Sequence, residues 1–511
     1  MQGLQHTRAI SDTAKADQRR QSIRMTLTTA LTRHLANPAL FGDLTSMKSL
    51  AKHLGKETFQ VFNPSTGELL AELPGMGVAE TKEAIDKATI AQAEWAAMTA
   101  RARSDVLWRW HQLIVDHTDD LAAILTAEMG KPLAEAKSEV SHAAAYLQWY
   151  AEEANRIYGE TISAPSTDRR MLVIKQPIGV VGTITPWNFP ASMVARKISP
   201  ALAAGCAIVL KPAEQTPLVA GAMFALAEKA GFPDGVLNLV YAAEGDAVGH
   251  ELCTNAKVRK ISFTGSTEVG RLLMRQCADQ IKKVSLELGG NAPFIVFDDA
   301  DVDAAVDGAL QAKFRNGGQT CVSANRLYVQ AGVHDEFAEK FAARVATLTV
   351  GDGFAPDVAI GPLIDTRALA KIEAHIADAL EKGGTIRCGG ARHGKSGTFF
   401  QPTVLADISS SMRVAQEETF GPLAPIIRFE DADQVVREAN DTIYGLAAYF
   451  YKRVWRVAEA LEYGMVGINT GRMSSEAAPF GGMKQSGIGR EGSRHGLEDY
   501  LEMKYLCMGG I

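Results

Sequence analysis

The sequence predicts an α/β protein with two domains, each built around a largely parallel β-sheet. From about residue 78 onward, segments with helical spacing of apolar residues alternate with short apolar runs typical of buried strands. Strands that alternate with helices favour βαβ units and therefore parallel sheets. The chain has 511 residues, which is too long for one simple core and indicates two or three domains.

The expected elements follow from these patterns in chain order. A helix is predicted around 84–95, where Ala84, Ala88 and Trp95 fall at helical spacing, and another around 337–348. Five apolar runs are predicted to be buried strands: 179–183, 207–210, 236–240, 260–263 and 294–297.

Turn residues mark two further features. Thr216 followed by Pro217 predicts the start of a helix, with Thr216 as its cap, and Gly231 predicts its end. The segment 157–175 is polar in its middle and is typical of a hairpin that leaves the domain surface.

Composition excludes several classes of protein. Hydrophobic residues make up 46% and charged residues 22% of the chain, which is ordinary for a globular protein. The net charge of −6 offers no basic surface for nucleic acid, and no apolar run reaches the ~18 residues of a membrane span. The cysteines contain no CxxC pair, so we expect no metal site, no disulfide framework and a cytoplasmic location. They are Cys206, Cys253, Cys277, Cys321, Cys388 and Cys507.

Residues 1–48 differ from the rest of the chain. They carry five arginines among many serines, threonines and alanines. This composition allows an organelle-targeting peptide, but Asp12 and Asp17 disfavour one. We favour a mobile tail, or a true translation start at Met25.

A cysteine and a carboxylate form the first candidate catalytic pair. Cys321 ends the run Phe-Arg-Asn-Gly-Gly-Gln-Thr-Cys, 34 residues after Glu287. A free thiol has a pKa near ~8.5, so a nucleophilic cysteine needs a lowered pKa or a neighbouring base, and Glu287 is the candidate. A lone cysteine is more often a small buried apolar residue. A cysteine–histidine hydrolase is an alternative, although the next histidine, His334, begins a predicted helix.

Six short runs, spread over most of the chain, occur in a fixed order. They are 185–190 (Thr-Pro-Trp-Asn-Phe-Pro), 211–214 (Lys-Pro-Ala-Glu), 263–270 (Phe-Thr-Gly-Ser-Thr-Glu-Val-Gly), 286–291 (Leu-Glu-Leu-Gly-Gly-Asn), 314–321 and 417–422 (Glu-Glu-Thr-Phe-Gly-Pro). Together they resemble the aldehyde dehydrogenase superfamily. The resemblance extends from about residue 58 to the C-terminus, and within the family it is closest to the succinate-semialdehyde dehydrogenases.

The resemblance implies a division of the chain. It predicts a Rossmann-like cofactor domain, a catalytic domain and a small β arm for oligomerisation, hence a homodimer or homotetramer. The expected parts are 1–48 for the tail, 49–154 and 178–288 for the dinucleotide-binding domain, 289–485 for the catalytic domain, and 155–177 and 486–511 for the arm. The active site is then expected where the two domains meet.

The cofactor site is expected at a strand–turn–helix unit around 260–274. Such a unit places free backbone N–H groups where a pyrophosphate can sit, although the spacing is not GxGxxG and the local signal is weak. Glu214 can accept hydrogen bonds from both ribose hydroxyls and would repel a 2′-phosphate, so we expect NAD to be preferred over NADP. The resemblance assigns the cofactor to Trp187, Lys211, Glu214, Gly265, Ser266, Gly270, Glu418 and Phe420.

The resemblance also implies a reaction, the NAD(P)-dependent oxidation of an aldehyde to an acid. Cys321 attacks the carbonyl to give a thiohemiacetal, whose oxyanion Asn188 and the Cys321 backbone N–H stabilise. Hydride transfer leaves a thioester, which a water activated by Glu287 hydrolyses. Relatives that pass the acyl group to coenzyme A lack this glutamate, so Glu287 argues for hydrolysis.

Two arginines and a serine are the candidate substrate ligands. Arg196 and Arg315 match arginines of succinate-semialdehyde dehydrogenases, as Ser474 matches a serine, and a guanidinium can grip a distal carboxylate bidentately. Arginines at such positions equally often have a structural role, in which they form contacts at helix ends and domain boundaries. Glutarate semialdehyde is one methylene longer, which pockets discriminate by only ~1–3 kcal/mol, so overlap is expected.

Three departures from the family stand out. Arg472 replaces an aliphatic residue, and it either adds a third cation to the pocket or points outward. Ser323 stands where some relatives have a second cysteine, so a redox switch between neighbouring cysteines is not expected. A few residues are missing near Lys452.

Overall fold

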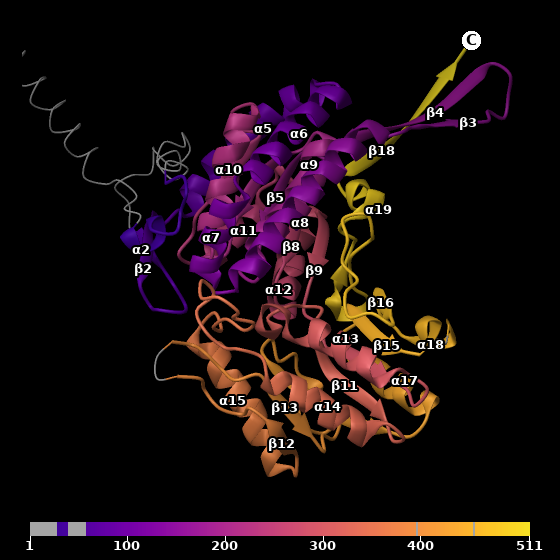
Figure 1. Ribbon diagram of the computed structural model, residues 1–511. Helices are drawn as coiled ribbons and strands as arrows, with labels where there is room; N and C mark the ends of the chain where they lie inside the picture. Colours follow the sequence, from indigo (N-terminus) through magenta and orange to yellow (C-terminus); the bar gives the residue numbers. More distant parts are fainter. Residues whose placement is uncertain (1–27, 39–57, 395–396, 453–454) are drawn as a thin grey trace, which may run out of the picture.

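The computed structural model describes residues 28–38, 58–394, 397–452 and 455–511. Two α/β domains lie one above the other in Figure 1, and a narrow sheet projects from the upper domain. The predicted fold class, with two parallel-sheet domains, is confirmed. Met25 and most of the predicted tail lie outside the described residues, as do Arg453 and Val454 of the shortened connection.

The first domain contains a six-stranded sheet in the order β17–β9–β8–β5–β6–β7. Its strands are parallel except for β17, which pairs antiparallel with β9. The strands are β5 (Val180–Ile184), β6 (Ala207–Lys211), β7 (Leu237–Leu239), β8 (Val258–Thr264), β9 (Lys283–Glu287) and β17 (Gly487–Ile488). Four of the five predicted strands therefore lie in this sheet, within a residue or two of their expected ends.

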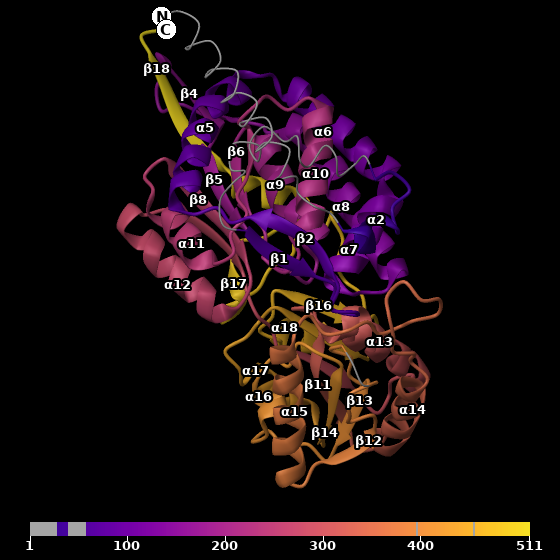
Figure 2. The ribbon, with the colours of Figure 1, turned by 90° about the vertical axis from the view of Figure 1, so that its left-hand side faces the viewer.

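Helices cover both faces of this sheet (Figures 1 and 2). They are α5 (Val78–Ala97), α6 (Ala100–Asp116), α7 (Thr118–Met129), α8 (Leu133–Glu153), α9 (Pro190–Ala204), α10 (Leu218–Ala230), α11 (Gly245–Thr254) and α12 (Thr267–Cys277). Every residue of α9 is buried, because α8, α10 and the sheet surround it. This helix begins directly after Asn188 and carries Arg196, so its burial fixes both.

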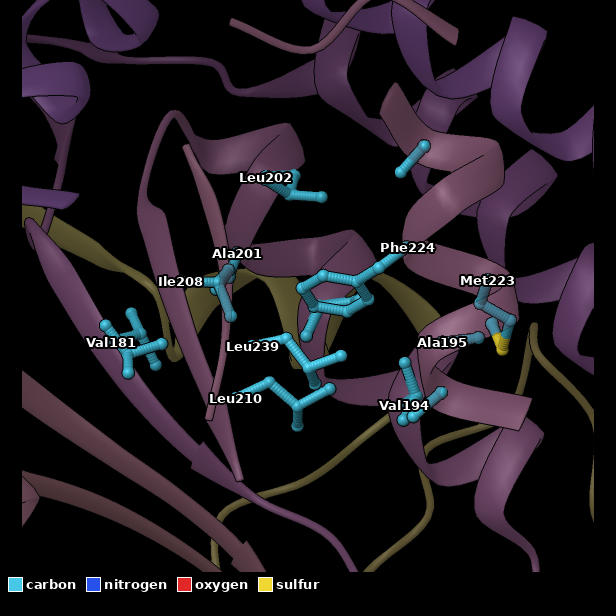
Figure 3. Close-up of a cluster of buried hydrophobic side chains, with 14 of the residues drawn as sticks. Val181, Val194, Ala195, Ala201, Leu202, Ile208, Leu210, Met223, Phe224 and Leu239 are labelled. Carbon is cyan, nitrogen blue, oxygen red and sulfur yellow. The ribbon is translucent and has the colours of Figure 1, made fainter. Parts of the chain in front are cut away.

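The core of the first domain forms where α9 and α10 meet the sheet (Figure 3). Val181 and Leu210 of the sheet face Val194 of α9 and Phe224 of α10, and all four are at most 2% exposed. Burying a side chain of this size contributes about 1.5–3 kcal/mol relative to leaving it in water.

The cap of α10 differs from the prediction. Glu128 of α7 accepts hydrogen bonds from the N–H groups of Leu218 (2.7 Å) and Val219 (2.9 Å), whereas Thr216 directs its hydroxyl to the Trp187 carbonyl. A carboxylate 90 residues away therefore satisfies the helix start. The expected end at Gly231 is confirmed, since this residue has φ +92°.

The second domain contains a seven-stranded sheet in the order β12–β13–β14–β11–β10–β15–β16. Its strands are β10 (Ala292–Val296), β11 (Ala324–Gln330), β12 (Thr385–Cys388), β13 (Thr403–Ala406), β14 (Leu423–Phe429), β15 (Ala447–Tyr451) and β16 (Met465–Ile468). Its helices are α13 (Val302–Phe314), α14 (His334–Ala346), α15 (Thr366–Glu381), α16 (Arg413–Gln416), α17 (Ala432–Asn440) and α18 (Trp455–Ala460). Phe294 and Ile295 belong to separate apolar clusters, because successive strand residues point to opposite faces.

The projecting sheet consists of β3 (Glu160–Ile162), β4 (Arg169–Pro177) and β18 (Leu501–Gly509), all antiparallel. The hairpin predicted for 157–175 is thus present. The predicted arm segment 486–511 is shorter than expected, because β17 and α19 (Ser493–Glu498) pack on the first domain and only β18 belongs to the arm.

The N-terminal part of the described chain packs on the first domain. The short helix α2 (Thr29–Thr32) buries Leu31 beside the hairpin of β1 (Thr58–Phe62) and β2 (Leu69–Pro74). Residues 28–38 therefore differ from the mobile tail that was expected. No helix in the described ranges has the length and apolarity to cross a membrane.

Candidate active site

The two sheets are joined by the short connection 288–291. Glu287 is the last residue of β9 in the first sheet, and Ala292 is the first residue of β10 in the second. Cys321 lies in the turn before β11, the neighbour of β10. Both candidate catalytic residues therefore lie where the two domains meet, as predicted.

Glycines bring the backbone close to Cys321. Asn316, Gly317 and Gly318 all have left-handed φ angles, of 53°, 61° and 74°. A Cβ at Gly318 would lie 2.2 Å from the Gly421 carbonyl, and one at Gly290 would lie 2.3 Å from the Cys321 carbonyl. A side chain at either position would push the turn away from the domain junction, so glycine is required there.

Cys321 opens into a cavity of about 580 Å³. The cavity contains the candidate substrate ligands Arg196, Arg315 and Ser474, and also Arg472. Further residues that line it are Ala134, Glu135, Ser138, Glu139, Ser141, His142, Phe189, Ser192, Met193, Thr320, Val322 and Phe480. The structure therefore brings the predicted nucleophile and all three predicted substrate ligands to one space.

The thiol and the carboxylate both resist ionisation. Burial, with the Glu418 and Glu287 charges, raises the pKa of Cys321 to about 12, although Arg196 and Arg315 oppose the shift. Burial and the Glu491 charge hold the pKa of Glu287 well above its usual range. A neutral thiol at physiological pH needs a base, as the sequence suggested.

A buried ion pair fixes Asn188. The Asn188 carbonyl accepts hydrogen bonds from Lys131 Nζ (2.8 Å) and Asn316 Nδ2 (2.9 Å), and its own Nδ2 donates to the Gln319 carbonyl at 3.0 Å. Lys131 in turn lies 2.5 Å from Glu139. An amide carries two N–H bonds, so one remains for another acceptor close to the Cys321 turn. The pair was not found from the sequence.

Glu139 also caps α9. Its carboxylate accepts from the N–H groups of Ala191 (3.0 Å) and Ser192 (3.2 Å). Lys131, Asn188 and the start of α9 are therefore held by one carboxylate, which makes the position of Asn188 depend on α8.

Arg196 is buried among aromatic rings and one carboxylate. Its guanidinium lies 3.9 Å from the Phe480 ring centre and 5.3 Å from that of Tyr146, and its Nε is 3.3 Å from Glu491. Glu491 is also 2.5 Å from Lys197 Nζ. Sequence reasoning missed Glu491, which is more than 290 residues away along the chain.

Two further cavity residues complete the lining. Arg315 is half-buried and stacks over the Phe189 ring at 5.1 Å. His142 was not predicted; burial, with the Arg196 and Arg315 charges, lowers its pKa to about 4, so its ring is neutral.

The predicted cofactor residues lie on both sides of the domain junction. Lys211 ends β6, and its Nζ is 3.1 Å from Glu214. Ser266 caps α12 by accepting from the Val269 N–H at 3.3 Å. Gly265 precedes this cap, and a Cβ at Gly270 would lie 2.4 Å from Leu288, so α12 packs closely against the connection. The cation, the carboxylate and the helix start occupy the carboxyl ends of parallel strands, which fits a dinucleotide.

The second domain contributes Glu418 and Phe420. Glu418 accepts the Gly290 N–H at 2.8 Å, and burial raises its pKa to about 7. Phe420 meets Trp187 edge to face at 5.4 Å. These contacts link the loops of the two domains beside the Cys321 turn.

In the described ranges, no three His, Cys, Asp or Glu side chains group as metal ligands would.

The fold and this site together define a class of protein. Residues 51–506 match the family model "Aldehyde dehydrogenase family". The chain belongs to the aldehyde dehydrogenase family, and it is an oxidoreductase of that family.

Individual relatives show which members of the family the chain is similar to. A probable succinate-semialdehyde dehydrogenase (NADP(+)) of Sinorhizobium fredii is 78% identical over 491 residues, covering 95% of this chain and 100% of the relative. A succinate-semialdehyde dehydrogenase (NADP(+)) of Escherichia coli is 61% identical, covering 89% and 95%. The crystal structure of an E. coli NADP-dependent enzyme superposes with a TM-score of 0.88 at 60% identity, covering 89% of this chain and 95% of that one.

Proposed function

We propose that this protein oxidises succinate semialdehyde to succinate with NAD or NADP. The observation that carries the proposal is the Cys321 cavity with Arg196 in its wall. Arg196 is 3% exposed, and its Nη2 has no hydrogen-bond partner among the described residues. A buried N–H group without an acceptor is costly, and a substrate carboxylate would supply the acceptor that Nη2 lacks. The names of the two relatives point to the same substrate.

The proposed reaction begins at Cys321. Its Sγ attacks the aldehyde carbon while the thiol proton leaves to Glu287, directly or through a water. The new oxyanion accepts hydrogen bonds from Asn188 Nδ2 and from the Cys321 backbone N–H. A bound nicotinamide dinucleotide supplies the hydride acceptor.

The second half of the reaction is hydrolysis. After hydride loss the acyl group remains as a thioester on Cys321 Sγ. Glu287 first releases the thiol proton to solvent, then takes a proton from the attacking water and returns it to Sγ as the C–S bond breaks. The thiol is released with the acid. Because the pKa values of both groups are raised, we expect kcat/KM to increase from neutral to alkaline pH.

The cofactor residues are proposed from the same geometry. Lys211 and Glu214 would hold the adenosine ribose, the start of α12 the pyrophosphate, and Glu418 the nicotinamide ribose. The Glu214 carboxylate supports a preference for NAD. The relatives' names specify NADP(+) instead, so the kcat/KM ratio for the two cofactors is the deciding measurement.

We also propose a homodimer or homotetramer in the cytoplasm. Apolar side chains on the projecting sheet are exposed, including Met503, Tyr505 and Met508. A second copy of the chain would cover them. The six cysteines are free, which supports a reducing compartment.

The test is reduction of NAD and NADP by the purified protein with aldehydes of different charge. Succinate semialdehyde is compared with propanal and betaine aldehyde, and Cys321→Ala serves as the blank. We expect a much higher kcat/KM for succinate semialdehyde than for the other two aldehydes. In Arg196→Met the ratio of kcat/KM for succinate semialdehyde to that for propanal should fall at least 10-fold, since a charge-assisted hydrogen bond is worth about 1.5–3 kcal/mol. Equal turnover of the uncharged or cationic aldehyde would refute the substrate assignment.

A further inference from the structure

A buried histidine lies beside the loop that carries two of the expected cofactor residues. His375 is on α15, and its side chain is fully buried. Its Nε2 is 3.1 Å from Glu417 Oε2, and its Nδ1 is 3.3 Å from Thr419 Oγ1. One ring therefore contacts the residues on both sides of Glu418.

The charges around the ring determine which of its nitrogens donates. Arg413 binds the Glu417 carboxylate with two N–H bonds (2.9 and 3.2 Å), and this contact, together with His375, lowers the pKa of Glu417 to about 2. Burial lowers the pKa of His375, although Glu417 opposes the shift. The ring is then neutral at physiological pH. Its Nε2–H donates to the ionised Glu417, and its Nδ1 accepts from the Thr419 hydroxyl.

The residue that follows this contact has a strained backbone. Phe420 has φ +57°, a left-handed conformation that bulky residues rarely adopt. Such a conformation persists only where surrounding contacts impose it. In this conformation Phe420 meets Trp187 of the first domain edge to face. The strain therefore places the Phe420 ring at the domain junction.

The helix α15 holds the same loop at a second point. A Cβ at Gly421 would clash with Ile372, which lies one turn before His375 on α15. A Cβ at Gly318 would clash with the Gly421 carbonyl on the other side. The loop 417–421 is thus packed between α15 and the turn that precedes β11.

We propose that His375 is a positioning residue for the nicotinamide half of the bound dinucleotide. It holds Glu417 and Thr419, and thereby sets the directions of Glu418 and Phe420. Its own ring is fully buried, so it acts without touching the cofactor. The inference rests on the proposed function, in which Glu418 holds the nicotinamide ribose.

The proposal predicts that the two halves of the cofactor respond differently to the loss of His375. Lys211, Glu214 and the start of α12, which would hold the adenosine half, are on the first domain. The helix α15 and the loop 417–421 are on the second domain. A change at His375 should therefore weaken the nicotinamide half alone.

The experiment measures Kd for NADH and for ADP on the full-length protein by isothermal titration calorimetry. ADP carries the adenosine half without the nicotinamide or its ribose. His375→Leu removes both ring contacts. We expect it to raise Kd for NADH about tenfold, the size of the charge-assisted hydrogen bond that Glu418 would lose, and Kd for ADP by less than about twofold. At saturating cofactor, NADH formation in the first turnover should slow about 10- to 100-fold, as for a reacting group misplaced by up to about 1 Å.

Two further variants of α15 distinguish positioning from a general loss of packing. Glu373→Gln removes an exposed ion pair with Arg392 on the same helix, and it should leave both Kd values unchanged. His375→Gln keeps an N–H donor for Glu417 and should recover part of the NADH affinity. If His375→Leu does not fold, Thr419→Val takes its place, because it removes the hydroxyl at nearly constant shape. It should raise Kd for NADH about threefold.

Glu418→Gln separates the inference from the proposed function. If Glu418→Gln weakens NADH binding while the His375 and Thr419 variants do not, the inference is overturned and the proposed function stands. Equal weakening of NADH and ADP in His375→Leu would also overturn the inference, because a general loss of packing affects both ligands. If Glu418→Gln leaves Kd for NADH unchanged, the role of Glu418 in the proposed function is wrong, and the inference fails with it.

Discussion

Replacing Lys131 by methionine should weaken both the stability of the first domain and catalysis, because one buried cation supports both. Lys131 and Glu139 are at most 1% exposed at their side chains. Lys131 Nζ also donates to the Asn188 carbonyl at 2.8 Å and lies 3.9 Å from the centre of the Phe189 ring. Methionine has a similar length but no charge, so Glu139 would stay buried without its counterion.

The size of the effect follows from these contacts. Breaking a buried ion pair by removing one partner costs about 3–5 kcal/mol. Glu139 retains two backbone N–H donors at the start of α9, so we expect the lower end of this range. At about 2–4 °C per kcal/mol for a domain of this size, Tm should fall by roughly 6–12 °C. Asn188 would lose one of two hydrogen bonds at its carbonyl, and a misplaced oxyanion donor costs about 10²–10³ in kcat.

Thermal scans and steady-state kinetics at saturating cofactor measure the two effects. Lys137→Met is the matched control, because Lys137 is on α8, the helix that carries Glu139, and pairs with Asp119 at the surface, where a pair is worth at most about 1 kcal/mol. The double variant Lys131→Met/Glu139→Gln removes the uncompensated charge and should recover part of the Tm. A Tm for Lys131→Met equal to that of Lys137→Met would refute the reasoning.

Four further predictions concern single groups. Because burial raises the pKa of Cys321 to about 12, alkylation by iodoacetamide should accelerate about tenfold per pH unit from neutral to pH ~10; a plateau near neutral pH would contradict this. Glu287→Gln should slow both the NADH burst and the steady turnover, the latter by about 10²–10⁴, because Glu287 takes the thiol proton and activates the water; a burst at the rate of the unaltered enzyme would argue against its role as the base for Cys321. Burial lowers the pKa of Lys313 from 10.5 to about 7, so between these values the unfolded chain binds the extra proton and stability should rise with pH. Over this pH range the Tm of Lys313→Met should rise less than that of the unaltered protein. The same change of Tm with pH in both proteins would contradict the prediction. Glu214→Ala should raise the NADP/NAD ratio of kcat/KM about tenfold, which an unchanged ratio would rule out.

The sequence predicted most of what is determined locally. The strands at 179–183 and 207–210 could be predicted because apolar residues fill them. Both strands are fully buried, and their observed ends lie within one residue of the expected ends. Asn188 and Arg196 could be placed at one site because the first precedes a helix and the second is on it.

What the sequence did not show depends on distant partners. Glu128 caps α10 in place of Thr216, and Glu491 meets Arg196 and Lys197 from near the other end of the chain. Nothing in the composition around Glu128 or Glu491 distinguishes them from surface carboxylates. Their roles follow only from packing, which brings together segments that no local pattern connects.

The contact of Glu491 with α9 also bears on how the protein is made. Arg196 and Lys197 are synthesised early and are buried in the first domain, but the carboxylate that balances them comes almost 300 residues later. Two buried cations without a counterion cost several kcal/mol. The first domain therefore cannot reach its final packing on the ribosome as an N-terminal unit normally does. It is completed only when the segment around Glu491 packs against α9, so a chain cut before Glu491 would lack the counterion of Arg196 and Lys197 as well as β18.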